Sequence, residues 1–358
     1  MGTSIQARNL TDADFDGLDG CNEILVDTRP DVIRAIHAEF LEAGADVVET
    51  NSFGSTAVVL GEYGIAERAY ELNLKAARLA REVADEFSTP ERPRFVAGSI
   101  GPTTKLPTLG HIGYDALKAD YDTQVRGLMD GGADILLIET SQDLLQAKAA
   151  LGAIDDVAKE RGAHIPTMVQ VTIELTGTML VGSDIATVIA ALEPFPLDAL
   201  GMNCATGPKE MEEHIRTLCA NAPFPVSCIP NAGIPENRGG HAHYHLGPQD
   251  LADYLKRFVG DYGVQIVGGC CGTRPDHIRA LAEIGRPLKP AKREPQFTFQ
   301  LSSLYSAVPM RVEPAPVLVG ERTNANGSKK FKDLLAEEDY DALVDIGKGQ
   351  VKKGAHLL

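Results

Sequence analysis

The sequence predicts an α/β fold, a (β/α)8 TIM barrel that lacks its first strand, followed by the first βα unit of a second barrel. Two observations support this prediction. Short runs rich in β-branched residues alternate with longer helical patterns, and the runs are apolar at successive positions, as parallel strands covered on both faces are. The chain offers eight helical patterns but seven strand-like runs, so one strand of a closed barrel is unaccounted for.

The seven strand candidates are short apolar runs that end in small or polar residues. They cover residues 46–51, 94–100, 134–140, 167–173, 198–203, 225–230 and 264–269. The eight helical patterns cover residues 30–43, 62–87, 114–131, 143–161, 184–193, 208–220, 248–260 and 275–284. Several of them open with Asp or Pro, as helix starts do. Because the first helical pattern precedes the first strand candidate, we expect the strand that feeds it to lie upstream of Met1.

A short phrase recurs where helices give way to strands. It reads EAGADVVETN at 42–51, DGGADILLIET at 130–140 and VKKGAHLL at 351–358. Its glycine can close a helix in a left-handed cap, and its alanine packs the tight loop before a buried strand. The third copy therefore indicates a further βα unit after the barrel.

The periodic pattern stops after the eighth helix, which divides the chain into three parts. We expect a barrel domain over residues 1–288, a linker over 289–315 and the start of a second barrel over 316–358. Six prolines and no helical period between residues 285 and 316 are typical of a linker. In the last part, residues 316–324 have the pattern of a strand and 328–352 that of a helix. One such unit has little core to bury by itself.

Composition excludes several classes of function. The 358 residues are 44% apolar and 23% charged, as in ordinary globular proteins. A net charge of -16 would repel a phosphate backbone, so we expect no nucleic-acid partner. No stretch reaches the roughly 18 apolar residues that span a bilayer, so we expect no membrane partner and a cytoplasmic location. Six cysteines without a secretion signal favour a reducing compartment, where thiols persist as nucleophiles or metal ligands.

Three cysteines follow strand candidates. Cys204 lies in GMNCATGP, and Cys270 and Cys271 lie in GGCCGTRPDHI. Barrel enzymes place their sites at the carboxyl ends of strands, and three thiolates suit zinc while leaving a fourth coordination position open. Two alternatives remain at this point, because free cysteines are often small buried residues and adjacent cysteines could form a strained disulfide.

We expect structural roles for two further cysteines and for a histidine-rich run. Cys219 falls in a helix and Cys228 inside a strand, so both are predicted to be core thiols. The run HAHYH at 241–245 could bind a metal through alternating histidines, but it has no matching partner nearby in the sequence. We therefore expect an exposed loop there.

Polar residues at other strand ends are candidates for substrate contacts. They are Asn51, Ser99, Glu139, Thr140 and Asn231. An acid such as Glu139 could hold the ammonium group of an amino acid, and Asn or Thr side chains could bind its carboxylate. The alternative for each is an ordinary capping or loop hydrogen bond.

Taken together, the segments GMNCATGP, GGCCGTRPDHI, PNAGIP, ETNSFGS and IETSQD resemble the homocysteine methyltransferase family, from Met1 to about residue 285. The resemblance implies that Cys204, Cys270 and Cys271 hold zinc and that the sulfur of homocysteine takes the open position. It also implies that Glu139 contacts the amino group of homocysteine and that Asn231 belongs to the site. Family members carry an Asp-Gly-Ala segment just before the residues that match Met1 to Thr3, so we expect that substrate-binding acid to be absent here.

The tail APVLVGERTNANGSKKF, at 315–331, resembles the opening of the pterin-binding barrel that follows the homocysteine domain in cobalamin-dependent members of the family. In it Glu321 and Asn324 match the start of the folate site. The resemblance implies transfer of a methyl group from methylcobalamin to zinc-bound homocysteine thiolate, giving methionine. In the full enzyme 5-methyltetrahydrofolate would be the methyl donor, and cobalamin-binding and folate-binding modules would be the partners.

Two other functions remain open. One is a stand-alone homocysteine methyltransferase that uses betaine or S-methylmethionine. The other is an inactive zinc-binding fragment, because loss of one strand would open the barrel and expose two sheet edges.

Overall fold

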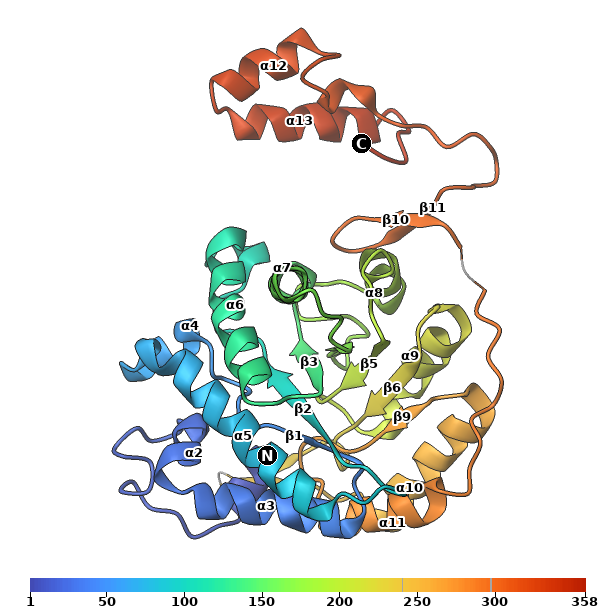
Figure 1. The fold of residues 1–358 in the computed structure, drawn as a ribbon. Helices are drawn as coiled ribbons and strands as arrows, with labels where there is room; N and C mark the ends of the chain where they lie inside the picture. The colour runs from blue at the N-terminus through green and yellow to red at the C-terminus, as the bar shows by residue number, and fades with distance from the viewer. Residues whose placement is uncertain (240, 297) are drawn as a thin grey trace. The chain divides into compact units, whose positions relative to one another are not determined.

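The computed structural model describes residues 1–239, 241–296 and 298–358 (Figure 1). The chain forms two compact units, Met1–Phe297 and Thr298–Leu358, called here the larger and the smaller unit. Among the described residues, no helix is both long enough and apolar enough to cross a bilayer.

The larger unit is built on a curled parallel sheet whose strands follow one another in chain order. The strands are β1 (Val47–Glu49), β2 (Phe95–Ile100), β3 (Ile135–Ser141), β4 (Thr167–Val171), β5 (Ala199–Asn203), β6 (Val226–Ile229) and β9 (Ile266–Val267). All seven predicted strands are therefore confirmed, and each pairs with its neighbour in the sequence. In the described part of the chain β1 and β9 are the two edges and do not pair with each other, which agrees with the expected barrel of seven strands.

The predicted helices surround this sheet (Figure 1). They are α3 (Pro30–Ala43), α5 (Ala69–Phe87), α6 (Tyr114–Asp130), α7 (Leu144–Arg161), α8 (Ile185–Leu192), α9 (Pro208–Asn221), α10 (Pro248–Arg257) and α11 (Pro275–Gly285). The pattern at 62–87 gives one long helix only from Ala69 onward. Before it lie two 3-10 turns, Gly61–Tyr63 and Ala66–Arg68, because Gly64 adopts a left-handed φ of 74° that ends the first turn.

Alternation along the strands separates the residues that face the helices from those that face the inside of the barrel. Val48 of β1 packs with Leu41 of α3 and Val83 of α5, so it faces the helices. Ala97 of β2 belongs to a separate cluster with Leu137, Met168 and Ala199 from other strands, so it faces inward. Ser99 and Glu139 lie two residues beyond Ala97 and Leu137 on the same strands. They therefore face inward as well, closer to the carboxyl ends of the sheet.

His37 of α3 should make the stability of the larger unit depend on pH. Its side chain is 2% exposed, and its Nε2 has no hydrogen-bond partner among the described residues. Burial lowers the pKa of His37 to about 4. Between pH of about 6.5 and 4, the unfolded chain binds a proton at this position that the folded chain does not bind.

The free energy of unfolding should therefore fall by about 2 to 3 kcal/mol as the pH drops through this window. Replacing His37 by leucine removes this contribution and should flatten the acid side of the stability profile. Urea unfolding of both proteins at pH 7 and pH 4.5 measures the difference. An equal loss of stability in the two proteins would contradict the assignment of a neutral buried histidine.

The smaller unit contains a hairpin and two helices. Strand β10 (Gln300–Ser302) pairs antiparallel with β11 (Ala307–Pro309), inside the stretch expected to be a linker. Helices α12 (Lys329–Ala336) and α13 (Tyr340–Val351) replace the single helix expected over 328–352. The break occurs because the side chain of Asp339 caps α13 by accepting from the amide of Ala342, while Glu338 takes a φ of 57°.

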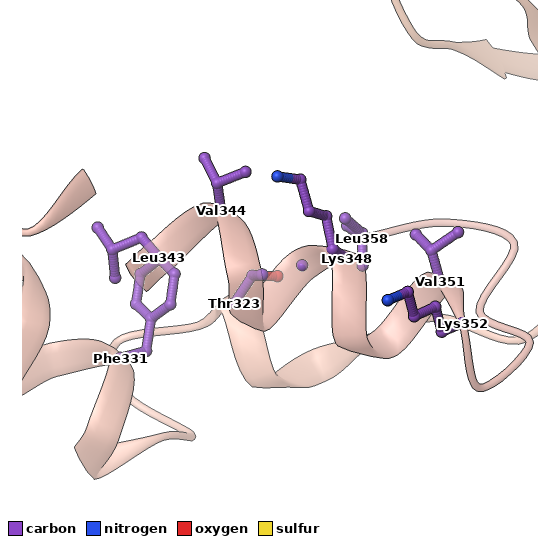
Figure 2. Close-up of a pocket in the computed structure, with 9 residues that line it drawn as sticks. Thr323, Phe331, Leu343, Val344, Lys348, Val351, Lys352 and Leu358 are labelled. Atoms are coloured by element: carbon purple, nitrogen blue, oxygen red, sulfur yellow. The ribbon is translucent and has the colours of Figure 1, made fainter. Parts of the chain in front are cut away.

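The strand expected over 316–324 is reduced to one parallel bridge, between Val319 and Leu357. Beside it the two helices leave an apolar cleft of about 640 Å³ (Figure 2). Phe331, Leu343 and Val344 line one part of it, and Val351 and Leu358 line another. Val344 and Val351 remain more than half exposed, so the smaller unit covers little of its own apolar surface.

Candidate metal centre and substrate site

The three predicted cysteines converge at the carboxyl ends of the strands. Cys204 directly follows β5, and Cys270 and Cys271 follow β9. Their sulfur atoms all lie within 4.8 Å of one another, and those of Cys204 and Cys271 are 3.9 Å apart. Two thiolates on a tetrahedral zinc ion, with Zn–S bonds of about 2.3 Å, would lie about 3.8 Å apart. The sulfur positions and the donor chemistry therefore fit zinc.

All six cysteines are free thiols, so the disulfide considered for Cys270 and Cys271 does not form. Cys219, at 5% exposure, and Cys228, at 0%, are buried in the core, as predicted. In the described part of the chain, the triad is the one group of histidine, cysteine and acidic residues arranged to hold a metal ion.

Strained backbone holds the first cysteine in place. Cys204 and Ala205 both have positive φ, 61° and 57°, and Thr140 near the end of β3 has a φ of 54°. The left-handed region costs a non-glycine residue about 1–2 kcal/mol. Strain of this kind persists where surrounding contacts impose it, and such positions cluster at functional sites. Three of the five non-glycine residues with positive φ among the described residues lie here.

Close packing of the thiols couples their ionisation. Hydrogen bonds from the thiols of Cys204 and Cys270 lower the pKa of Cys271. The contacts with Cys204 and Cys271, together with burial, raise the pKa of Cys270. One thiolate therefore forms readily while its neighbours hold their protons, and three thiolates can coexist only around a cation.

Asn203, the last residue of β5, connects the cysteines to the predicted acid. Its Nδ2 donates to Oε2 of Glu139 at 3.2 Å and lies 3.9 Å from the sulfur of Cys270. The same amide donates to the hydroxyl of Thr140 at 2.9 Å, and its Oδ1 accepts from the Thr140 amide at 2.8 Å. Ser99 donates its hydroxyl to Oε1 of Glu139 at 2.6 Å. Ser99, Glu139 and Thr140 therefore form one cluster with the cysteines.

Glu139 is a buried acid without a cationic side-chain partner among the described residues. It is 6% exposed, and burial, followed by the charge of Glu49, raises its pKa to about 8. A positively charged ligand would favour its ionised form.

The two predicted asparagines are placed differently. Asn231 accepts from the backbone amide of Cys271 through Oδ1, at 3.0 Å, and so holds the cysteine loop. Asn51 donates to the backbone oxygen of Asn22 at 2.7 Å. Both side chains form hydrogen bonds with the backbone of loops, which was the alternative to a substrate contact.

The histidine-rich run forms part of a hairpin, β7 (Glu236–Arg238) with β8 (His241–His243), instead of the expected loop. His245 pairs with Glu236 at 3.0 Å, outside the cysteine triad. Tyr244 packs its ring against Gly272, next to Cys271, so closely that a Cβ on Gly272 would lie 2.2 Å from the ring. No signal in the sequence pointed to this tyrosine.

The predicted folate residues lie in the smaller unit. Glu321 begins a 3-10 turn, Glu321–Thr323, and its carboxylate lies over Gly327. Asn324 follows this turn and accepts from the amide of Asn326 at 2.9 Å. Both residues are exposed, and their assignment to a folate site stays a prediction.

Comparisons with known proteins show the family and support the fold. The chain belongs to the homocysteine S-methyltransferase family, whose model matches residues 1–284. The methionine synthases of Mycobacterium tuberculosis and Mycobacterium leprae are each 49% identical to it, and the match covers the whole chain. The chain spans 30% of the length of these two relatives.

Solved structures support the same fold. The metallated form of the homocysteine methyltransferase MmuM from Escherichia coli superposes with a TM-score of 0.65 at 24% identity. That match covers 79% of this chain and 93% of MmuM. The family and the barrel architecture predicted from the sequence are therefore confirmed.

Proposed function

We propose that this chain binds zinc through Cys204, Cys270 and Cys271 and presents homocysteine for methylation to methionine. The convergence of three thiols from two distant segments, at the carboxyl ends of the barrel strands, carries this proposal. When bound, zinc would keep the sulfur of homocysteine ionised and nucleophilic at neutral pH.

The residues of the chain would then position the substrate. Glu139 would bind the ammonium group of homocysteine, since its buried carboxylate lacks a cationic side-chain partner among the described residues. Ser99 and Asn203 hold its two oxygen atoms in place through hydrogen bonds of 2.6 and 3.2 Å. Asn231 fixes the backbone at Cys271, which limits movement of the sulfur atoms.

The proposed methyl donor is methylcobalamin, recharged from 5-methyltetrahydrofolate, with cobalamin-binding and folate-binding modules as partners. The 49% identity to two methionine synthases supports this choice, as does the match to 30% of their length. Glu321 and Asn324 would contribute to the folate site. A stand-alone methyltransferase with a betaine or S-methylmethionine donor is the second candidate, because MmuM is matched over 93% of its own chain.

X-ray absorption at the zinc edge tests the central proposal on the zinc-loaded chain. Three sulfur neighbours are expected without substrate and four after addition of homocysteine. A sulfur count that does not change on addition would overturn the proposal. Incubation with homocysteine and either methylcobalamin, betaine or S-methylmethionine then decides the donor, by which mixture yields methionine.

A further inference from the structure

Ser99, whose hydroxyl donates to Glu139, is held by the loop that follows β1. Glu49 and Ala97 are the last register pair between β1 and β2. Beyond that pair the amide of Thr50 still donates to the backbone oxygen of Ala97, at 2.9 Å. The amide of Ser99 donates to a side chain instead, the Oγ1 of Thr50, also at 2.9 Å. The hydroxyl of Thr50 therefore extends the pairing of the two strands as far as Ser99.

Ser52 completes a closed ring of hydrogen bonds with Thr50 and the backbone of Ser99. Its Oγ donates to the backbone oxygen of Ser99 at 2.8 Å and lies 2.5 Å from Oγ1 of Thr50. A hydroxyl carries one proton. Because Ser52 gives its proton to the carbonyl, Thr50 must be the donor between the two hydroxyls. Thr50 thus accepts from the amide of Ser99 and donates to Ser52, and its only proton is used within the ring.

The ring is buried and is held by a neighbouring helix. Thr50 is 2% exposed and Ser52 is 0% exposed. The buried side chain of Gln124, on α6, donates from Nε2 to the backbone oxygen of Ser52 at 2.8 Å. Breaking a buried hydrogen bond leaves a polar group without a partner, so a satisfied network of this kind favours one geometry. Thr50 and Ser52 therefore fix the backbone from which the hydroxyl of Ser99 reaches Glu139.

We propose that Thr50 and Ser52 are positioning residues of the substrate ammonium site and act on Glu139 through Ser99. This inference rests on the proposed function, in which Glu139 binds the ammonium group of homocysteine. In this assignment the two hydroxyls affect the amino end of the ligand and not the sulfur end. Loss of either hydroxyl should therefore weaken ligands that carry an ammonium group and spare those that lack one.

Two thiols that differ in one group provide the test. L-homocysteine and 4-mercaptobutyrate share the thiol, the carbon chain and the carboxylate, and only the first has an ammonium group. Calorimetric titration of the zinc-loaded chain measures both affinities. Thr50→Val keeps the branched shape of the side chain and removes the hydroxyl, and should weaken homocysteine binding about 10-fold, the scale of one hydrogen bond to a charged group. Binding of 4-mercaptobutyrate should change less than about 2-fold.

A double substitution tests whether Thr50 acts through Ser99. Ser99→Ala removes the hydroxyl that donates to Glu139, so it should itself weaken homocysteine binding. Once that hydroxyl is absent, adding Thr50→Val should weaken homocysteine binding by less than about 2-fold further. If the two losses instead add in full, Thr50 does not act through Ser99 and the inference fails.

Thr187→Val is the matched control, since Thr187 of α8 is fully buried and its hydroxyl has no hydrogen-bond partner among the described residues. It should leave both affinities unchanged. Thr50→Ser keeps the hydroxyl and should retain most of the preference for homocysteine.

Ser52→Ala should repeat the effect of Thr50→Val, and it serves if Thr50→Val does not fold. Unchanged homocysteine binding in either folded variant, or an equal loss for the two thiols, would overturn the inference alone. Failure of the unsubstituted zinc-loaded chain to bind either thiol would overturn the proposed function with it.

Discussion

Substitution of Cys270 by alanine should release zinc from the protein and abolish methylation of homocysteine. The sulfur of Cys270 belongs to the triad whose members lie within 4.8 Å of one another, so its loss leaves two of three ligands. Loss of even an outer contact to a metal ligand typically costs 10- to 100-fold in affinity, and loss of the ligand itself should cost more. Zinc content after dialysis against a chelator should fall from about one equivalent to near zero.

Cys219→Ala is the control for that experiment. Cys219 is a buried thiol of α9 that is not part of the triad, so zinc content and methylation should stay as in the unsubstituted protein. Retention of a full equivalent of zinc by Cys270→Ala, with unchanged affinity, would rule out the assigned ligand set.

Gly201→Ala should destabilise the larger unit by about 3 kcal/mol, the upper part of the range for overpacked cores. A Cβ at this position would lie 1.9 Å from Oγ of Ser227 and 2.2 Å from its backbone oxygen. Gly201 and Ser227 are register partners in β5 and β6, so the strands would have to separate. Because Asn203 lies two residues further along β5, zinc affinity should fall as well. Urea unfolding and zinc titration measure the two effects.

Gly285→Ala provides the comparison within the same unit. Gly285 is the last residue of α11, and a Cβ there would meet no atom within 4 Å. Alanine favours helix over glycine by up to about 1 kcal/mol, so stability should stay level or rise slightly. A similar loss in both variants would show that strand contact at Gly201 is not the cause.

The sequence was sufficient for the sheet and the cysteine site because both depend on simple rules. Apolar runs that alternate with helical patterns form strands paired in chain order, and a parallel barrel gathers the carboxyl ends of those strands at one rim. Cys204 and Cys270 lie far apart in the chain, yet each follows a strand, so their meeting could be predicted.

Individual side-chain partners could not be predicted in the same way. The side-chain oxygen of Asn231 accepts from the backbone amide of Cys271, and the ring of Tyr244 packs on Gly272. Both contacts depend on the conformation of loops, which the alternation of strands and helices in the sequence does not determine. The split between α12 and α13 had a readable signal in the capping residue Asp339.

Asn203 touches Glu139 with the same amide nitrogen that lies 3.9 Å from the sulfur of Cys270. One short side chain thus sets the span between Glu139, the proposed partner of the amino end, and Cys270, a proposed ligand of the zinc that would hold the thiol. A ligand must match that span to reach both ends at once, so cysteine, which is one methylene shorter than homocysteine, would satisfy one end only. Discrimination of about 10- to 200-fold is the scale that a single methylene allows.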